Sequence, residues 1–335
     1  MALAAIINPI DTSEALLFYY EKVEDTYSLA VRHSSVSGGR DQYFENRNTI
    51  GTRVKPPPSD LAVTSFLGLV RVFGISKIPK VVKSADPDIA VISQLSPVVN
   101  PIDKPSAATV QPGDYSAISA CGSVTNTGYV SFLKFVLLPI STSWSTFKLT
   151  DWPREVGGVV SLVNYTINKS VSPTHKTVDV TAAAYSKLAS IVVKGKPWVF
   201  FQNKAGKYLY YHNILAGETF RIPTTGMAEQ GTHLAVALSP DNSILFLYYR
   251  NQDGNIARTW LHNGKWAPEE VAAEDAMDDD SAIAVVNHEK NLHIYFWNNG
   301  DVIHDVNDLP DESQLGASHA AGFHAVRAVP AESAE

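Results

Sequence analysis

A short apolar signature recurs six times along this chain, each time ahead of a strand pair that carries aromatic residues. The copies begin near positions 3, 61, 118, 188, 234 and 283. Repeats of roughly 40 to 50 residues are typical of propellers, in which each blade is a small sheet that buries its faces only against its neighbours. The repeat therefore predicts an all-β protein, a six-bladed β-propeller that forms a single domain over residues 1–335.

The fifth repeat shows the expected antiparallel strands most clearly. We expect strands over 234–238, 244–249 and 256–261, followed by a tight turn at Asn263 and Gly264. The pattern weakens between 75 and 113, where six prolines predict an extended loop with one or two short strands. We expect a second long connection between 149 and 181, and a last strand over 325–329 that closes the ring.

Charge and cysteine content narrow the possible functions. The net charge is −7 and no basic stripe is present, which argues against nucleic acid as a partner. Cys121 is the only cysteine, which excludes an intrachain disulfide and a cysteine-based zinc cluster. The histidines show no metal-site spacing. We therefore expect no metal and no cofactor.

The N-terminal segment and the lengths of the apolar runs indicate where in the cell the protein is expected. The short apolar run that starts near Leu3 has no basic segment before it, so it does not resemble a signal peptide. No apolar run approaches the roughly 20 residues that a membrane-spanning helix needs. We expect a cytoplasmic protein without a membrane span. The sequence does not indicate its oligomeric state.

The motifs of the fifth repeat resemble those of a known family. A Leu-Ala-Val strand is followed by an aromatic-ended strand, by Asp253-Gly254-Asn255-Ile256 and by Asn263-Gly264-Lys265-Trp266. This order is similar to a blade of the fungal fucose-specific lectins, which are six-bladed propellers. The likeness is best over 233–306, fair over 1–32 and 186–212, and poor over 60–180. In that family each sugar site has an Arg on the second strand, a Glu on the third strand, and a Trp or Tyr from the adjacent blade that stacks on the sugar.

This chain departs from the lectin pattern in most blades. Aligned on the aromatic pairs, only the second repeat keeps an arginine, Arg71, and its following strand shows no acid. The Arg and Glu positions are occupied by Phe246 and Arg258 in repeat five, His293 and Asp305 in repeat six, Trp198 and Tyr211 in repeat four, and Leu17 and Val31 in repeat one. Apolar and aromatic groups cannot pair with sugar hydroxyls, so we expect weak binding of fucose.

The chain also resembles a fungal group of hetero-Diels–Alderases, which are lectin-like propellers with sites rebuilt for hydrophobic ligands. They join a tropolone quinone methide to a terpene in meroterpenoid biosynthesis. The resemblance implies a cofactor-independent pericyclase of secondary metabolism whose partner is a small hydrophobic substrate derived from a polyketide or terpene. Our candidates for polar catalytic contacts are Arg258, His293 and Arg71; those for the aromatic walls of the site are Trp198, Tyr211, Phe246, Trp260 and Trp297.

Other functions stay open at this point. A degenerate fucose- or carbohydrate-binding lectin without catalysis is the main alternative, and an interaction scaffold is a third. The aromatic candidates are equally compatible with a packed core between blades. Glycoside hydrolysis is disfavoured, because the predicted inner strands are rich in Leu, Ala and Val and offer no converging carboxylates.

Overall fold

The computed structural model describes most of the predicted repeats. It covers residues 2–23, 26–36, 60–78, 89–97, 100–102, 117–123, 127–137, 158–167, 174–180, 182–183, 185–204, 208–273, 277–279, 281–289, 291–299, 301–308 and 310. The closing strand predicted over 325–329 lies outside these residues. Within these ranges no helix is long and apolar enough to cross a membrane.

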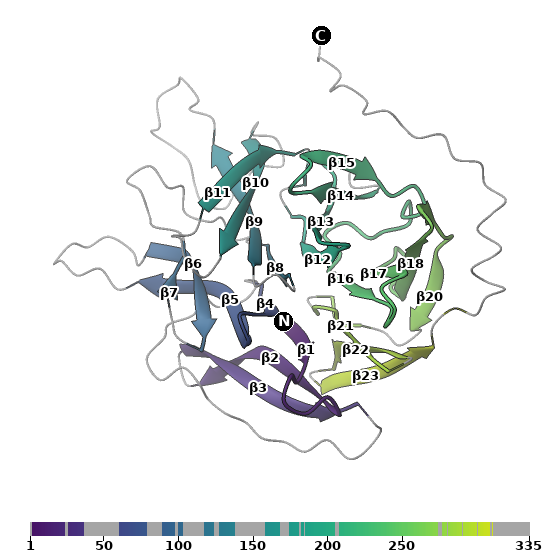
Figure 1. The fold of residues 1–335 in the computed structure, drawn as a ribbon, viewed down its shortest axis with the longest axis horizontal. Coiled ribbons are helices and arrows are strands. Elements are labelled where there is room, and N and C mark those ends of the chain that lie inside the picture. The colour runs from purple at the N-terminus through teal and green to yellow at the C-terminus, as the bar shows by residue number, and fades with distance from the viewer. Residues whose placement is uncertain are drawn as a thin grey trace, which may run out of the picture.

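The described strands form six antiparallel sheets, one for each repeat (Figure 1). Blade 1 contains β1 (Leu3–Ile7), β2 (Glu14–Val23) and β3 (Thr26–Ser35); blade 2 contains β4 (Ala62–Phe66), β5 (Leu69–Ile78), β6 (Ile89–Ser96) and β7 (Asn100–Pro101); blade 3 contains β8 (Ile118–Gly122), β9 (Gly128–Leu137), β10 (Gly158–Ile167) and β11 (Thr174–Asp179). Blade 4 contains β12 (Ala189–Val193), β13 (Lys196–Gln202), β14 (Leu209–Asn213) and β15 (Glu218–Arg221); blade 5 contains β16 (Leu234–Leu238), β17 (Ile244–Arg250), β18 (Ile256–His262), β19 (Lys265–Trp266) and β20 (Glu270–Ala273); blade 6 contains β21 (Ala284–His288), β22 (Asn291–Asn298) and β23 (Asp301–Asp308).

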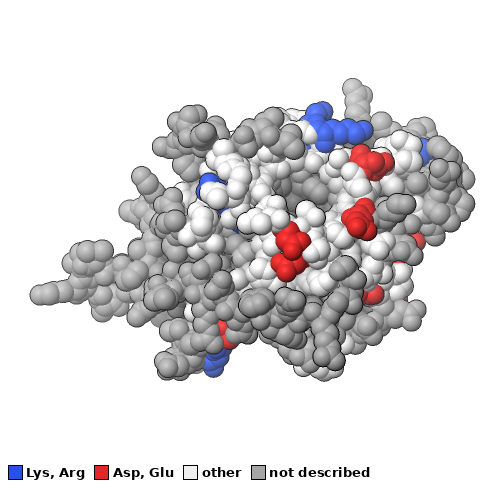
Figure 2. Space-filling model, turned by 60° about the horizontal axis from the view of Figure 1, so that its bottom comes forward, with Lys and Arg blue, Asp and Glu red and all other residues white. Residues whose placement is uncertain are grey.

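The first strands of the six sheets close a ring. Strand β1 contacts β4, β4 contacts β8, β8 contacts β12, β12 contacts β16, β16 contacts β21, and β21 returns to β1 (Figure 1). One face of the molecule is hollowed near its middle (Figure 2). The prediction of an all-β, six-bladed propeller is confirmed. That residues 1–335 form a single domain stays a prediction.

Apolar clusters fill all six junctions between neighbouring blades. The alternation of side chains along each strand makes this possible, because successive residues point to opposite faces of the sheet. Phe246 and Tyr248 of β17 pack toward Ile294 of blade 6. Tyr249 of the same strand packs toward Phe200 of blade 4. Each blade therefore contributes one face to each of two cores.

Buried hydroxyl groups fasten the ends of the strands in three successive blades. Each hydroxyl residue stands three positions before the first alanine of an inner strand and accepts a backbone N–H from the second strand at 2.7 Å. The pairs are Ser186 with Gln202, Thr232 with Arg250, and Ser281 with Trp297. Each hydroxyl also donates to the carbonyl of the next residue. The bonds satisfy backbone groups that are buried at the ends of the strands.

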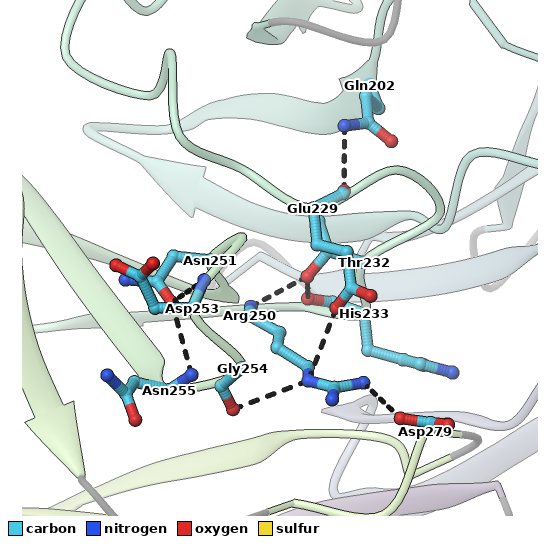
Figure 3. A network of polar contacts seen from close by, with 10 residues as sticks. All are labelled: Gln202, Glu229, Thr232, His233, Arg250, Asn251, Asp253, Gly254, Asn255 and Asp279. Carbon is cyan, nitrogen blue, oxygen red and sulfur yellow. Dashed lines mark hydrogen bonds and ion pairs between the residues drawn. The ribbon is translucent and has the colours of Figure 1, made fainter.

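In blade 5 these hydrogen bonds belong to a larger polar network that reaches both neighbouring blades (Figure 3). The guanidinium of Arg250 pairs with Glu229 at 3.2 Å and with Asp279 at 2.8 Å. Gln202 of blade 4 donates from Nε2 to the carbonyl of Glu229 at 2.9 Å. The network therefore connects β13, β17 and the segment that leads to blade 6.

The local predictions hold for blade 5 and fail in blade 3. The three strands predicted in blade 5 are confirmed to within one residue, and the predicted turn has both residues at positive φ, 49° at Asn263 and 77° at Gly264. The long connection expected over 149–181 is wrong, because residues 161–166 of β10 pair there with residues 174–179 of β11. The run Val-Val-Ser-Leu-Val-Asn-Tyr-Thr-Ile in this segment is rich in β-branched residues, which favours a strand.

Candidate functional site

Strand register shows which side chains share a groove between blades. Residues directly opposite each other on paired strands lie on the same face of the sheet. In blade 5, Tyr248 is opposite Arg258 and Phe246 is opposite Trp260. All four therefore face blade 6. The predicted pair of Phe246 and Arg258 lies close together, with the guanidinium carbon 6.0 Å from the centre of the phenyl ring.

The groove between blades 5 and 6 is tightly packed. Phe246 is fully buried, and Trp260 and Arg258 are only 5% and 8% exposed. Arg258 donates from Nε to a carboxylate oxygen of Glu270, a half-exposed residue of β20. Burial raises the pKa of the Tyr248 hydroxyl to about 12, and the neighbouring Arg258 partly opposes this shift. The groove therefore holds a neutral phenol beside an arginine whose charge is already paired.

The groove between blades 4 and 5 is the more open one. Trp198 of β13 stacks on Tyr211 of β14 at 4.5 Å and 15°, and Tyr211 stacks on Phe220 of β15 at 5.1 Å and 26°. The ring centre of Trp266, on β19 of blade 5, lies 6.2 Å from the ring centre of Tyr211. Phe220 is 37% exposed and the other three rings are half-buried. We call these four residues the aromatic groove.

The aromatic groove also offers donors. Burial, and secondarily Glu218, raises the pKa of Tyr211 above its ordinary value of 10, so its hydroxyl is a neutral donor at neutral pH and in mild base. The indole Nε1 of Trp198 is buried, and among the residues that the structure describes it has no hydrogen-bond partner. A buried donor without an acceptor is uncommon in proteins. Both groups belong to the pair that was aligned to the lectin Arg and Glu positions.

In blade 6 the structure does not bring together the two residues that the alignment paired, His293 and Asp305. Asp305 is opposite Ile294, which places it on the other face of the sheet from His293. The residue that lies beside His293 is His304, because His293 Nδ1 and His304 Nε2 are 2.9 Å apart. The cause is the hairpin loop, which has two residues between β22 and β23 but five between β17 and β18. An odd change in length moves each following side chain to the opposite face.

His293 lies in a closed junction between blades 6 and 1. It is 2% exposed, and burial, followed by its neighbours His304 and His288, lowers its pKa to about 4. The ring of Trp297 packs edge-to-face against Tyr19 of blade 1 at 5.8 Å. Neither predicted residue of this blade lines the aromatic groove.

Blade 1 corrects one further assignment, and blade 2 adds a contact that the sequence did not show. Leu17 is opposite Arg32, and Val31 is opposite the residue after Leu17, so Leu17 and Val31 lie on different faces of blade 1. In blade 2 the strand after Arg71, β6, carries no acid, as expected; it carries Gln94, whose Oε1 accepts a hydrogen bond from Arg71 Nη1 at 2.6 Å. The guanidinium also lies 4.7 Å over the ring of Phe66.

Sequence reasoning missed Gln94 for two reasons. It lies in the proline-rich segment, where no register could be assigned, and a β-bulge between Val72 and Phe73 shifts the pairing. It also missed Phe220 and Trp266, although Trp266 stands in the lectin-like Asn-Gly-Lys-Trp motif. Within the described ranges no group of three His, Cys, Asp or Glu residues is placed to hold a metal ion.

Comparisons with known proteins support the fold. By sequence, the chain matches no protein-family model and no curated protein. By structure, it is similar to the fucose-specific lectin from Aleuria aurantia, with a TM-score of 0.57 at 12% identity over 92% of this chain and 94% of that one. It is also similar to AofleA from Arthrobotrys oligospora, with a TM-score of 0.56 at 12% identity over 92% and 86%. Trypanosoma rangeli sialidase matches with a TM-score of 0.55 at 10% identity, over 94% of this chain and 55% of the sialidase. Likeness at this level of identity shows a shared propeller fold.

Proposed function

We propose that this protein binds a small, largely apolar molecule in the aromatic groove and acts on it as a cofactor-independent hetero-Diels–Alderase. In this proposal it joins a diene of the tropolone quinone methide type to a terpene in meroterpenoid biosynthesis. The observation that carries the proposal is the stack of Trp198, Tyr211 and Phe220 with Trp266 beside it. Two of these rings stand at positions aligned to the charged pair of the lectins.

The chemistry needs positioning more than reactive groups. A hetero-Diels–Alder reaction forms one C–C and one C–O bond and releases nothing, so no metal and no covalent nucleophile is required. Flat aromatic faces hold a planar diene and exclude water. Holding two reactants in register contributes up to roughly 7–11 kcal/mol in ideal cases. The aromatic groove supplies the rings of Trp198, Tyr211, Phe220 and Trp266 for this purpose.

A donor to the carbonyl oxygen of the diene completes this proposal. We assign that role to Tyr211, whose hydroxyl is protonated at neutral pH and whose pKa is raised further by burial. Arg258 is already paired with Glu270, and His293 lies in a closed junction. A positioned donor of this kind contributes roughly 10²- to 10⁴-fold in rate.

The test follows ligand binding and turnover separately. Tropolone is titrated against the protein while tryptophan fluorescence is recorded, with L-fucose as the comparison ligand. We expect saturation with tropolone, loss of binding in Trp198→Ala, and retention in the control Trp297→Phe. We then expect Tyr211→Phe to lower the rate of adduct formation from a quinone methide and a terpene by about 10²-fold or more, with a smaller change in binding. Saturation with fucose alone would refute the proposal.

A second function is favoured by one contact in blade 2. Arg71 and Gln94 are bonded at 2.6 Å and both are half-exposed, an arrangement that can pair with two adjacent hydroxyls of a sugar. We therefore keep a degenerate carbohydrate-binding lectin as the alternative. It predicts weak fucose binding that Arg71→Ala abolishes and Trp198→Ala leaves unchanged, measured by calorimetry.

A further inference from the structure

The channel of the ring contains a cavity that is separate from the aromatic groove. Its volume is about 350 Å³, and it lies where three inner strands end, β1 of blade 1, β16 of blade 5 and β21 of blade 6. Pockets that hold small ligands measure roughly 300–1,000 Å³, so this one is large enough for a compact molecule.

The walls of the cavity are mainly aliphatic, with Ser239, Asn242 and Asn287 adding polar groups, and the cavity is broadly open to solvent. Ile7, Val236 and Val285 line it, and each keeps part of its surface exposed although it lies in a strand of the inner ring. At the rim, Asn287 donates from Nδ2 to the carbonyl of Leu238 at 2.6 Å and so joins β21 to β16. Sites for small ligands are concave and lined mainly by apolar side chains, with a few polar groups that fix the orientation of the ligand. No charged side chain lines the cavity, so it would disfavour an ion.

The other end of the channel carries charge. Lys187 Nζ lies 2.7 Å from Asp60 Oδ1, and these residues precede the inner strands of blades 4 and 2. The two blades are not neighbours in the ring, so the ion pair reaches across the channel. His233, which directly precedes β16, lies near Lys187, and burial, followed by that charge, lowers its pKa well below its ordinary value. Inner strands thus begin at a polar end and finish at an apolar one.

We propose that the apolar end of the channel binds one small uncharged molecule of hydrocarbon or simple aromatic character. This site does not depend on the function proposed for the aromatic groove. Binding would cover the part of Val236 and Val285 that remains exposed and would bridge blade 1 to blades 5 and 6. The ion pair of Lys187 with Asp60 keeps the opposite end polar, so the ligand enters at the ends of β1, β16 and β21.

The test uses N-phenyl-1-naphthylamine, a neutral dye that becomes fluorescent in apolar sites. It is carried out in a Trp198→Ala background, in which the aromatic groove is disabled. We expect saturable binding of one dye per chain. Adding Val236→Trp or Val285→Trp, which fill the cavity from two different strands, should weaken binding by about tenfold or more. Adding Val271→Trp on the outer strand β20, where Val271 is 48% exposed, is the matched control and should change nothing.

Three results would overturn the inference. One is loss of dye binding through Trp198→Ala alone, which would leave the proposal for the aromatic groove intact. The second is equal affinity in the filled and control variants. The third is a diffraction map of the unaltered protein with dye that shows no density among Ile7, Val236 and Val285. That map locates the dye even if a filling variant does not fold.

Discussion

Acid should weaken the junction between blades 6 and 1 through His293. This side chain is 2% exposed and its Nδ1 lies 2.9 Å from His304 Nε2. Its pKa is about 4 in the folded chain, against 6.5 as the ordinary value, with burial as the largest cause. The unfolded chain therefore binds more protons between these two values. Stability contributed by the neutral ring is present above pH 6.5 and is lost as the pH falls toward 4.

The size of the effect follows from the two pKa values. One pKa unit corresponds to about 1.4 kcal/mol, and His293 alone should lower the free energy of unfolding by about 2 kcal/mol between pH 7 and pH 5. Urea unfolding is measured at both pH values on the unaltered protein and on His293→Gln. We expect the variant to lose about 2 kcal/mol of pH dependence, whatever its stability at pH 7. His262→Gln, at the end of β18, is the control. An equal pH dependence in all three proteins would refute the argument.

Three further substitutions test the packing and the buried polar contacts, each by urea unfolding at pH 7. Phe246→Ala should lower the free energy of unfolding by about 3–5 kcal/mol, because the ring is fully buried between blades 5 and 6; a loss under about 1 kcal/mol would contradict that packing. Lys187→Met should cost about 3–5 kcal/mol, because it leaves Asp60 buried and unpaired, and adding Asp60→Asn should recover part of the loss; no recovery would count against the ion pair. Thr232→Val should cost about 1–3 kcal/mol by leaving the N–H of Arg250 without its acceptor, while Thr232→Ser should cost less; equal losses would mean that the hydroxyl is not the cause.

Blade 5 was predictable because its local signals agree with one another. The Leu-Ala-Val run, the aromatic strand and the Asn263-Gly264 turn all specify the same hairpins. The alignment therefore found Phe246 and Arg258 together on one face. In blade 4 the same reasoning brought Trp198 and Tyr211 together, and they stack in the structure. Where turn chemistry fixed the register, sequence spacing was enough to find the pair.

Blades 1, 2 and 6 show what spacing cannot provide. The aligned pairs of blades 5 and 6 are both twelve residues apart, but the hairpin of blade 6 is shorter, so that His304 lies beside His293 where Asp305 was expected. In blade 1 the alignment selected Leu17, which lies on the opposite face of the sheet from Val31. In blade 2 a β-bulge and a long connection hid Gln94. Because the side-chain period of a strand is two, each slip of one residue exchanges a side chain that faces one neighbouring blade for one that faces the other.

The divergence of these pairs bears on how the ring can work. A ring of identical sites gains avidity when several of them engage one surface at once. Here the paired positions differ from blade to blade: Arg71 with Gln94, Trp198 with Tyr211, Phe246 with Arg258, and His293 with His304. No two of these pairs offer the same chemistry, so no single ligand suits all of the grooves. Selection for a multivalent reader would keep them alike, whereas a protein that handles one molecule needs only one good groove. We therefore expect calorimetry with tropolone to give about one bound molecule per chain in the aromatic groove; several equivalent sites would contradict this reasoning.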